Sequence, residues 1–150
     1  MSTRSVIAMK NPDQSVSGIY CHFDGYPRGV GETLLTCYND EEKIKRLIAL
    51  GDLSSLGDLS SLGERLEPSP GSGHSFDNPE SGVTVAYHRD RGEELHPAVT
   101  WSNETEMLEN TPDTHCAEYC YLWAGSCWYV GCTRSQKWYR MSDLRSFSGR

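Results

Sequence analysis

Two stretches near the start of the chain predict a pair of strands: the first is a short apolar run, and the second alternates between apolar and polar positions. One strand is expected over residues 5–9 and a second over 16–24, with a turn at residues 11–14 between them. Successive side chains of a strand point to opposite faces. The inner, apolar face of the second strand is therefore predicted to carry Ile19, Cys21 and Phe23.

Helical spacing follows this hairpin. The apolar residues Val30, Leu34, Leu35 and Tyr38 predict a helix over 29–38. A second helix is predicted from Asp40, which caps it, through Leu50, and Gly51 ends it.

The second half of the chain adds further predicted strands. Residues 83–88 alternate cleanly and place Val83, Val85 and Tyr87 on an inner face. A hairpin is expected over 118–132 around Ala124-Gly125-Ser126, with a short strand at 97–101, a short helix at 103–109 and a helical turn at 141–147. The fold class expected is α+β: one domain, 1–150, with an antiparallel sheet and helices packed on one face.

One segment is predicted to be a flexible loop. Residues 51–56 read GDLSSL, and the same six letters follow at 57–62. Two copies of six residues are too short for a solenoid repeat, so we interpret them as a duplication inside a tolerant loop. Pro68, Pro70, Gly71 and Gly73 extend that loop, which we place at 52–80.

Charge and composition argue against some classes of function. The 150 residues carry a formal net charge of -7, which argues against a general nucleic-acid binder because such a protein needs a basic patch. The N-terminus lacks the pattern of a signal peptide, and no apolar run is long enough for a membrane span. We expect a cytoplasmic protein with its six cysteines as free thiols, no membrane contact and no direct nucleic-acid contact.

A polar face is the first candidate site. The predicted strand over 16–24, and that over 83–88 with its extension to Asp90, each carry a His and an Asp two residues apart, opposite their apolar face. If these strands are neighbours, His22, Asp24, His88 and Asp90 would gather on one face of the sheet. Tyr26 follows in the adjoining turn. Such a group suits a transition metal or an acid–base pair. The alternative is a solvated face where Arg89 and Arg91 pair with nearby acids, and we expect neither a metal nor a cofactor.

Cysteines and aromatic residues supply two further candidates. The spacing of Cys116, Cys120, Cys127 and Cys132, with His115 alongside, permits a zinc site, although core thiols fit the apolar surroundings better. The last third is rich in Tyr and Trp, which build both cores and binding patches. We expect Trp123 and Trp128 to contribute to a binding patch.

A weaker candidate is an anion site. Gly29-Val30-Gly31 precedes a predicted helix, whose N-terminus favours negative charge, and Arg28, Arg89 and Arg91 would add positive charge. The pattern lacks the further glycines and the lysine of a phosphate-binding loop.

Five short segments of the sequence, taken together, resemble a known group of proteins. They are SVI at 5–7, GIYCHFDGYP at 18–27, LIALGDLSSL at 47–56, HSFD at 74–77 and AYHRDRGE at 86–93. In these the chain resembles a group of small proteins of bacteriophages, prophages and mobile elements that share a YCHFDGYP motif. It departs from the group in the second GDLSSL copy and in the cysteine-rich C-terminal end.

The resemblance implies a function by association. Small accessory phage proteins often bind and block host machinery, including CRISPR nucleases. The expectation is an anti-CRISPR-like inhibitor in the host cytoplasm, whose partner is a host protein or ribonucleoprotein complex. Two alternatives stay open: a small metal-assisted hydrolase acting on a nucleotide, and a sponge for a phosphorylated signalling molecule.

Overall fold

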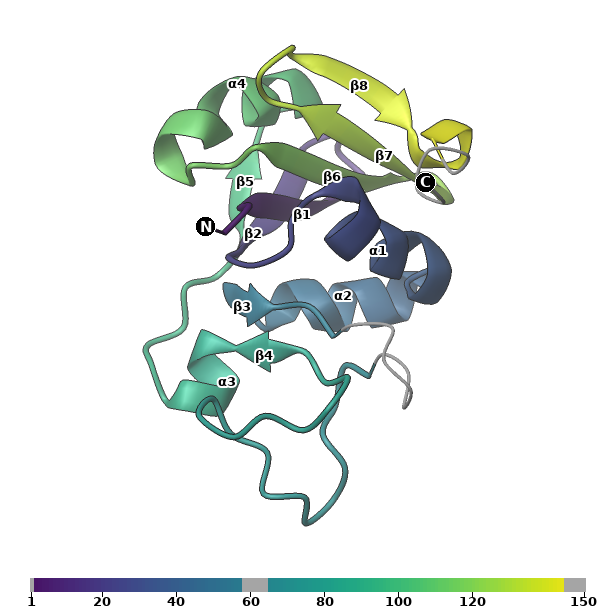
Figure 1. Ribbon diagram of the computed structural model, residues 1–150. Helices are drawn as coiled ribbons and strands as arrows, with labels where there is room; N and C mark the ends of the chain where they lie inside the picture. The colour runs from purple at the N-terminus through teal and green to yellow at the C-terminus, as the bar shows by residue number, and fades with distance from the viewer. Residues whose placement is uncertain (1, 58–64, 145–150) are drawn as a thin grey trace.

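The predicted N-terminal hairpin is present in a computed structural model that describes residues 2–57 and 65–144 (Figure 1). Strand β1 (Ser5–Lys10) pairs antiparallel with β2 (Val16–Cys21), with Ile7 opposite Ile19. Strand β2 ends at Cys21, three residues earlier than the alternation suggested.

Strand β1 lies inside the sheet, between β2 and a strand from the far end of the chain. That strand is β6 (Tyr119–Ala124), and it runs parallel to β1 with Ile7 opposite Tyr121. Beyond it lie β7 (Cys127–Cys132) and β8 (Lys137–Arg140), each antiparallel to its neighbour. The hairpin predicted around Gly125 is thus confirmed.

The other side of the sheet is built from short strands. β3 (Leu53–Ser55) continues the sheet parallel to β2, and β4 (Val85–Ala86) follows antiparallel to β3. β5 (Val99–Trp101) also pairs with β2, over residues 16–18. The α+β class is confirmed, but the sheet is mixed rather than antiparallel.

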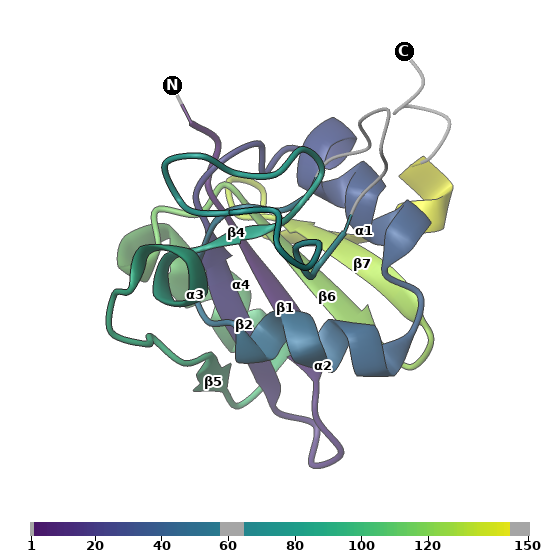
Figure 2. The same cartoon turned by 90° about the horizontal axis from the view of Figure 1, so that it is seen from below.

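Helices cover both faces of this sheet, not one as expected (Figures 1 and 2). Helices α1 (Glu32–Cys37) and α2 (Glu41–Ala49) pack against the face that carries Ile7. Helix α4 (Glu104–Thr114) packs against the opposite face, which carries Val6 and Ala8. The physical reason is that Val6, Ile7 and Ala8 are all apolar, so both faces of β1 need a cover.

Local signals account for the helix ends. A π-helical turn, η1 (Pro27–Gly31), leads into α1. The Asp40 side chain caps α2 by accepting a 3.2 Å hydrogen bond from the Glu42 amide, as predicted. The Asn103 side chain caps α4 by accepting from the Glu106 amide at 2.9 Å. A 3-10 turn, η2 (Met141–Leu144), supplies the described part of the expected C-terminal helical turn.

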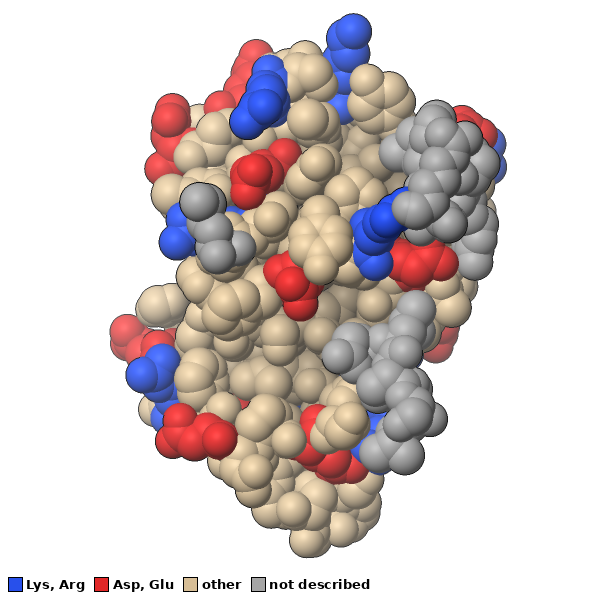
Figure 3. Space-filling model, in the orientation of Figure 1, with Lys and Arg blue, Asp and Glu red and all other residues tan. Residues whose placement is uncertain are grey.

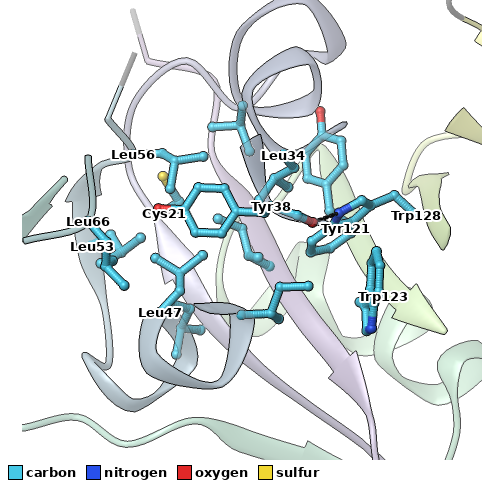
Figure 4. Packing of buried hydrophobic residues seen from close by; sticks show 14 of the residues in the cluster. Cys21, Leu34, Tyr38, Leu47, Leu53, Leu56, Leu66, Tyr121, Trp123 and Trp128 are labelled. Atoms are coloured by element: carbon cyan, nitrogen blue, oxygen red, sulfur yellow. Dashed lines mark hydrogen bonds between the residues drawn. The ribbon is translucent and has the colours of Figure 1, made fainter. Parts of the chain in front are cut away.

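The main core lies between the sheet and helices α1 and α2 (Figure 4). Tyr38, Tyr121 and Trp128 are its largest fully buried side chains. The Trp128 Nε1 donates a 2.7 Å hydrogen bond to the Tyr38 carbonyl. This bond satisfies two buried polar groups and ties the end of α1 to β7.

The predicted loop over 52–80 contains a strand of the sheet. The first GDLSSL copy supplies β3, and its Leu53 and Leu56 are buried in the main core. Beyond the second copy, the Leu66 side chain is also buried, and Arg65 forms a bridge with Val83. The expectation of a loop is therefore wrong for these parts, and most of the second copy, from residue 58, lies outside the described residues.

The strand predicted over 83–88 is also shorter than expected. Only Val85–Ala86 form β4, and the chain then turns into helix α3 (Tyr87–Arg91). Gly92 ends that helix with a φ of 76°, a value that glycine adopts without strain. Val83 and Val85 are buried as predicted, whereas Tyr87 is half-buried.

Candidate functional site

The turn after β2 projects residues 22–28 from the sheet, and we call this segment the 22–28 loop. It begins beside β3, where the amides of His22 and Phe23 donate to the carbonyls of Leu53 and Ser54. Asp24 then takes a φ of 58°, the left-handed conformation that ends the extended run. Phe23 lies beyond Cys21, the last residue of β2, and its side chain does not reach the core.

Backbone hydrogen bonds fix the 22–28 loop from beneath. The Tyr121 hydroxyl donates a 2.6 Å bond to the Gly25 carbonyl in a buried position, and the Gly25 amide donates to Thr3 at 2.8 Å. The Asp24 carbonyl accepts from the Val30 amide at 2.8 Å. These bonds hold both ends of the loop against the strands and η1.

Two glycines are required for this close packing. A Cβ at position 25 would lie 2.7 Å from the Ser5 Cβ, and one at position 29 would lie 2.3 Å from the Asp24 carbonyl oxygen. Both distances are shorter than van der Waals contact, so the backbone could not stay in place. The DGYPRG sequence thus specifies this one turn geometry.

The outer surface of the loop displays large side chains. Phe23 is 45% exposed and Tyr26 42% exposed, and Asp24 and Arg28 are exposed as well. Together they line a shallow cavity of about 180 Å³. The prediction that Phe23 belongs to the core is wrong, and the Asp24-Gly25 pair is the sequence signal that marks the earlier strand end.

His22 stands at the base of the loop. Its Nδ1 lies 2.6 Å from the Tyr20 hydroxyl, and its ring meets the Phe23 ring edge-on, with 4.5 Å between the centroids. Burial raises the pKa of Tyr20. The imidazole is therefore held in one orientation and supports the Phe23 ring.

His88 and Asp90 do not join His22 and Asp24 on one strand face, because both lie on helix α3. His88 is exposed, and its Nδ1 lies 2.7 Å from the Glu93 carbonyl. Asp90 has a buried side chain that accepts from the Ala86 amide at 2.8 Å. The predicted four-residue polar face is wrong, since helical geometry replaces strand alternation here.

Asp90 belongs to a buried polar network that the sequence did not indicate. Its carboxylate lies 3.3 Å from Nε2 of the buried His74, whose Nδ1 accepts from the Glu80 amide. Burial opposes ionisation of Asp90, but hydrogen bonds from Arg89 and the Ala86 amide outweigh it and keep its pKa below the ordinary value. We infer that this network stabilises the segment around α3.

Two of the three arginines expected at an anion site, Arg89 and Arg91, are engaged in other contacts, whereas Arg28 is exposed in the 22–28 loop. Arg89 donates to the Leu66 carbonyl at 2.9 Å and to the Thr84 carbonyl at 2.6 Å. Arg91 lies 3.3 Å from Glu93 and stacks over the Phe76 ring at 4.6 Å. Gly29 and Gly31 lie within η1 rather than in an open phosphate-binding turn. The predicted phosphate site is therefore not assembled.

The two tryptophans proposed for a binding patch are core residues. Trp123 and Trp128 are buried and meet edge-to-face, with 5.5 Å between the ring centroids. Composition alone did not separate aromatic residues that fill a core from those that face a partner. Among the described residues after 118, the exposed aromatic side chain is Tyr139, which is 41% exposed.

The described residues contain no group of three or more His, Cys, Asp or Glu residues placed to hold a metal ion. Cys120 is buried beside Thr111, Cys116 is exposed, and Cys127 and Cys132 stand at opposite ends of β7. The zinc alternative is thus not supported within residues 2–57 and 65–144. In the same ranges, no helix is long and apolar enough to cross a membrane.

Comparisons with known proteins leave the chain without a matching relative. No protein-family model matches it, and no curated protein or solved structure gives a significant match.

Proposed function

We propose that this chain is a protein-binding domain that contacts its partner through the 22–28 loop. The supporting observation is that Phe23, Tyr26 and Arg28 are exposed on a backbone held by the buried Tyr121–Gly25 hydrogen bond and by main-chain hydrogen bonds. Aromatic side chains and arginine dominate the energetics of protein interfaces.

A fixed loop favours binding for a second reason. Association costs free energy when flexible groups become ordered, so a loop already held in place loses less on binding. The shallow cavity beside Tyr26 would accept one small apolar side chain of a partner. Asp24 adds a charge at the rim, where it selects partners more than it adds affinity.

The partner that the phage resemblance implies is a host defence complex. In this proposal the domain works in the host cytoplasm by covering a surface of a protein or ribonucleoprotein, as an anti-CRISPR-like inhibitor does. No chemistry at His22 is needed for that role, and its hydrogen bond to Tyr20 serves to hold Phe23 in place.

The test is phage plating on bacteria that carry a CRISPR–Cas system targeting the phage. The wild-type protein should restore plating, and Phe23→Ala combined with Tyr26→Ala should abolish that effect. The matched control is Val99→Ala, which shortens a comparably exposed apolar side chain on β5. Both variants should keep the wild-type melting temperature, because exposed side chains contribute little to stability.

Two outcomes would count against the proposal. Full activity of the folded double variant would show that the 22–28 loop is not the contact surface. Failure of the wild-type protein to restore plating across a panel of CRISPR types would reject the inhibitor assignment.

A further inference from the structure

Strand β8 is the last strand of the sheet on its side. It pairs with β7 along one edge, and no other strand in the described ranges pairs with its second edge. An edge strand presents backbone N–H and C=O groups that are ready to pair with another extended chain. Figure 1 shows β8 at the upper margin of the molecule, at the other end of the strand order from β3 and β4.

Positive charge gathers at this edge, in a chain whose net charge is -7. Arg134, Lys137 and Arg140 are all exposed, and within the described residues none of them forms an ion pair with a carboxylate. Other cations do form such pairs, as Lys10 does with Glu104 and Arg46 with Glu67. Figure 3 shows Lys and Arg side chains over the β8 end, with acidic side chains over α4 nearby.

The four residues of β8 have a symmetric order: cation, aromatic, aromatic, cation. Trp138 lies over Gly131, and a Cβ at that glycine would meet the indole at 3.0 Å. Trp138 and Arg140 share the face of the sheet that α4 covers, whereas Lys137 and Tyr139 share the other face. Each face of the edge therefore offers one aromatic ring and one positive charge.

We propose that β8 binds an extended acidic segment of a partner protein as an added strand. The complementary segment has the order acidic, apolar, apolar, acidic. Its carboxylates would lie beside Lys137 and Arg140, and its apolar residues beside Trp138 and Tyr139. Because the order of β8 is symmetric, the segment fits in either direction. Main-chain hydrogen bonds supply affinity in this mode, and alternate side chains supply specificity.

The same features disfavour two other occupants. Pairing of β8 with β8 of a second copy would place Lys137 and Arg140 of one chain against the same cations of the other. Single-stranded nucleic acid would need several exposed rings for stacking, but Trp138 is packed on Gly131 and leaves Tyr139 alone. This surface is separate from the 22–28 loop, so its failure in a test would leave the proposed function intact.

The experiment uses a fluorescent hexapeptide, Ser-Glu-Val-Phe-Glu-Ser, and measures its anisotropy with the full chain at low salt. The wild-type protein should bind it saturably. Lys137→Glu combined with Arg140→Glu should weaken binding by about tenfold or more, because like charges then face each other. A peptide with Lys in place of both Glu residues should regain binding to that variant.

The matched control is Lys45→Glu combined with Arg46→Glu on α2, which changes the net charge equally at exposed positions. It should bind the original peptide within about twofold of the wild type, since distant surface charges are screened. N-methylation of alternate peptide amides tests the added strand, and one of the two methylation patterns should abolish binding.

Three results would overturn the proposal. The first is no saturable binding of the peptide by the wild-type protein. The second is equal binding of both N-methylated peptides, which would show attraction by charge alone. The third is tighter binding of an oligothymidine than of the peptide, which would assign the edge to nucleic acid.

Discussion

The Tyr121 hydroxyl donates a 2.6 Å hydrogen bond to the Gly25 carbonyl across 96 residues of sequence. Tyr121 lies on β6 and is fully buried, whereas Gly25 lies in the 22–28 loop. The bond joins the core of the sheet to the proposed contact surface. The shape of that surface therefore depends on a residue that is buried in the core.

Tyr121→Phe should therefore destabilise the protein without changing its exterior. The change leaves a buried carbonyl without its donor, which costs about 1–3 kcal/mol. Urea unfolding measures that cost, and Tyr139→Phe on the surface serves as the control. An unchanged unfolding free energy in Tyr121→Phe would mean that the loop is held by its other bonds alone.

Trp128 should behave as a core residue. Its side chain is almost fully buried, and its indole donates to Tyr38, so Trp128→Ala should cost about 3–5 kcal/mol. Thermal unfolding checks this value against Tyr139→Ala, which should stay within about 0.5 kcal/mol of the wild type. A silent Trp128→Ala would contradict the packing between α1 and β7.

Acid should weaken the segment that precedes β4. Hydrogen bonds from the Ser69 side chain and amide lower the pKa of Glu80 from 4.5 to about 2. A lowered pKa in the folded state means that Glu80 contributes stability above about pH 4.5 and loses it as the pH falls towards 2. Melting temperatures across that range should fall more steeply for the wild type than for Glu80→Gln. Glu109→Gln, an exposed change on α4, should keep the wild-type profile.

Thiol reactivity should separate the cysteines by position. Burial raises the pKa of Cys21 and of Cys120 to about 12, so both should resist alkylation in the folded protein at neutral pH. Cys132 is half-buried; burial raises the pKa of its thiol, but hydrogen bonds from Ser135 outweigh this and lower it. Mass spectrometry should find Cys132 and the exposed Cys116 modified first. Early modification of Cys21 would contradict its place in the core.

Elements with strong local signals were predictable from the sequence. The turn residues at 11–14 predicted the β1–β2 hairpin, Asp40 predicted the start of α2, and Gly125 predicted the turn between β6 and β7. In each case the residues that specify the element lie within it.

Elements that depend on distant partners were not predictable in this way. Helix α3 forms where Arg89 reaches the Leu66 carbonyl, 23 residues away, and where Asp90 meets the buried His74. The alternating pattern over 83–88 does not indicate these contacts, because their partners lie elsewhere in the sequence. The parallel pairing of β1 with β6 could not be predicted for the same reason, since the two strands are far apart in the sequence.

The candidate site was predictable in part. The sequence pattern identified His22, Asp24 and Tyr26 as site residues, and the structure places all three in the 22–28 loop. The alternation also wrongly placed Phe23 on the inner face, because the pattern continues to Asp24 whereas β2 ends at Cys21. His88 and Asp90, which were predicted to complete the site, lie on helix α3 instead of on a strand.

The position of β1 between β2 and β6 has a consequence for synthesis of the chain. As the N-terminal half leaves the ribosome, β1 can pair with β2 on one side, but the backbone groups of its other edge stay unpaired until residues 119–124 are made. The central sheet therefore closes only after most of the polypeptide has emerged. Distant pairings of this kind slow folding, and in the meantime they leave an unpaired strand edge and apolar surface open to aggregation. Nascent chains that stall before β6 should thus be held by chaperones or degraded.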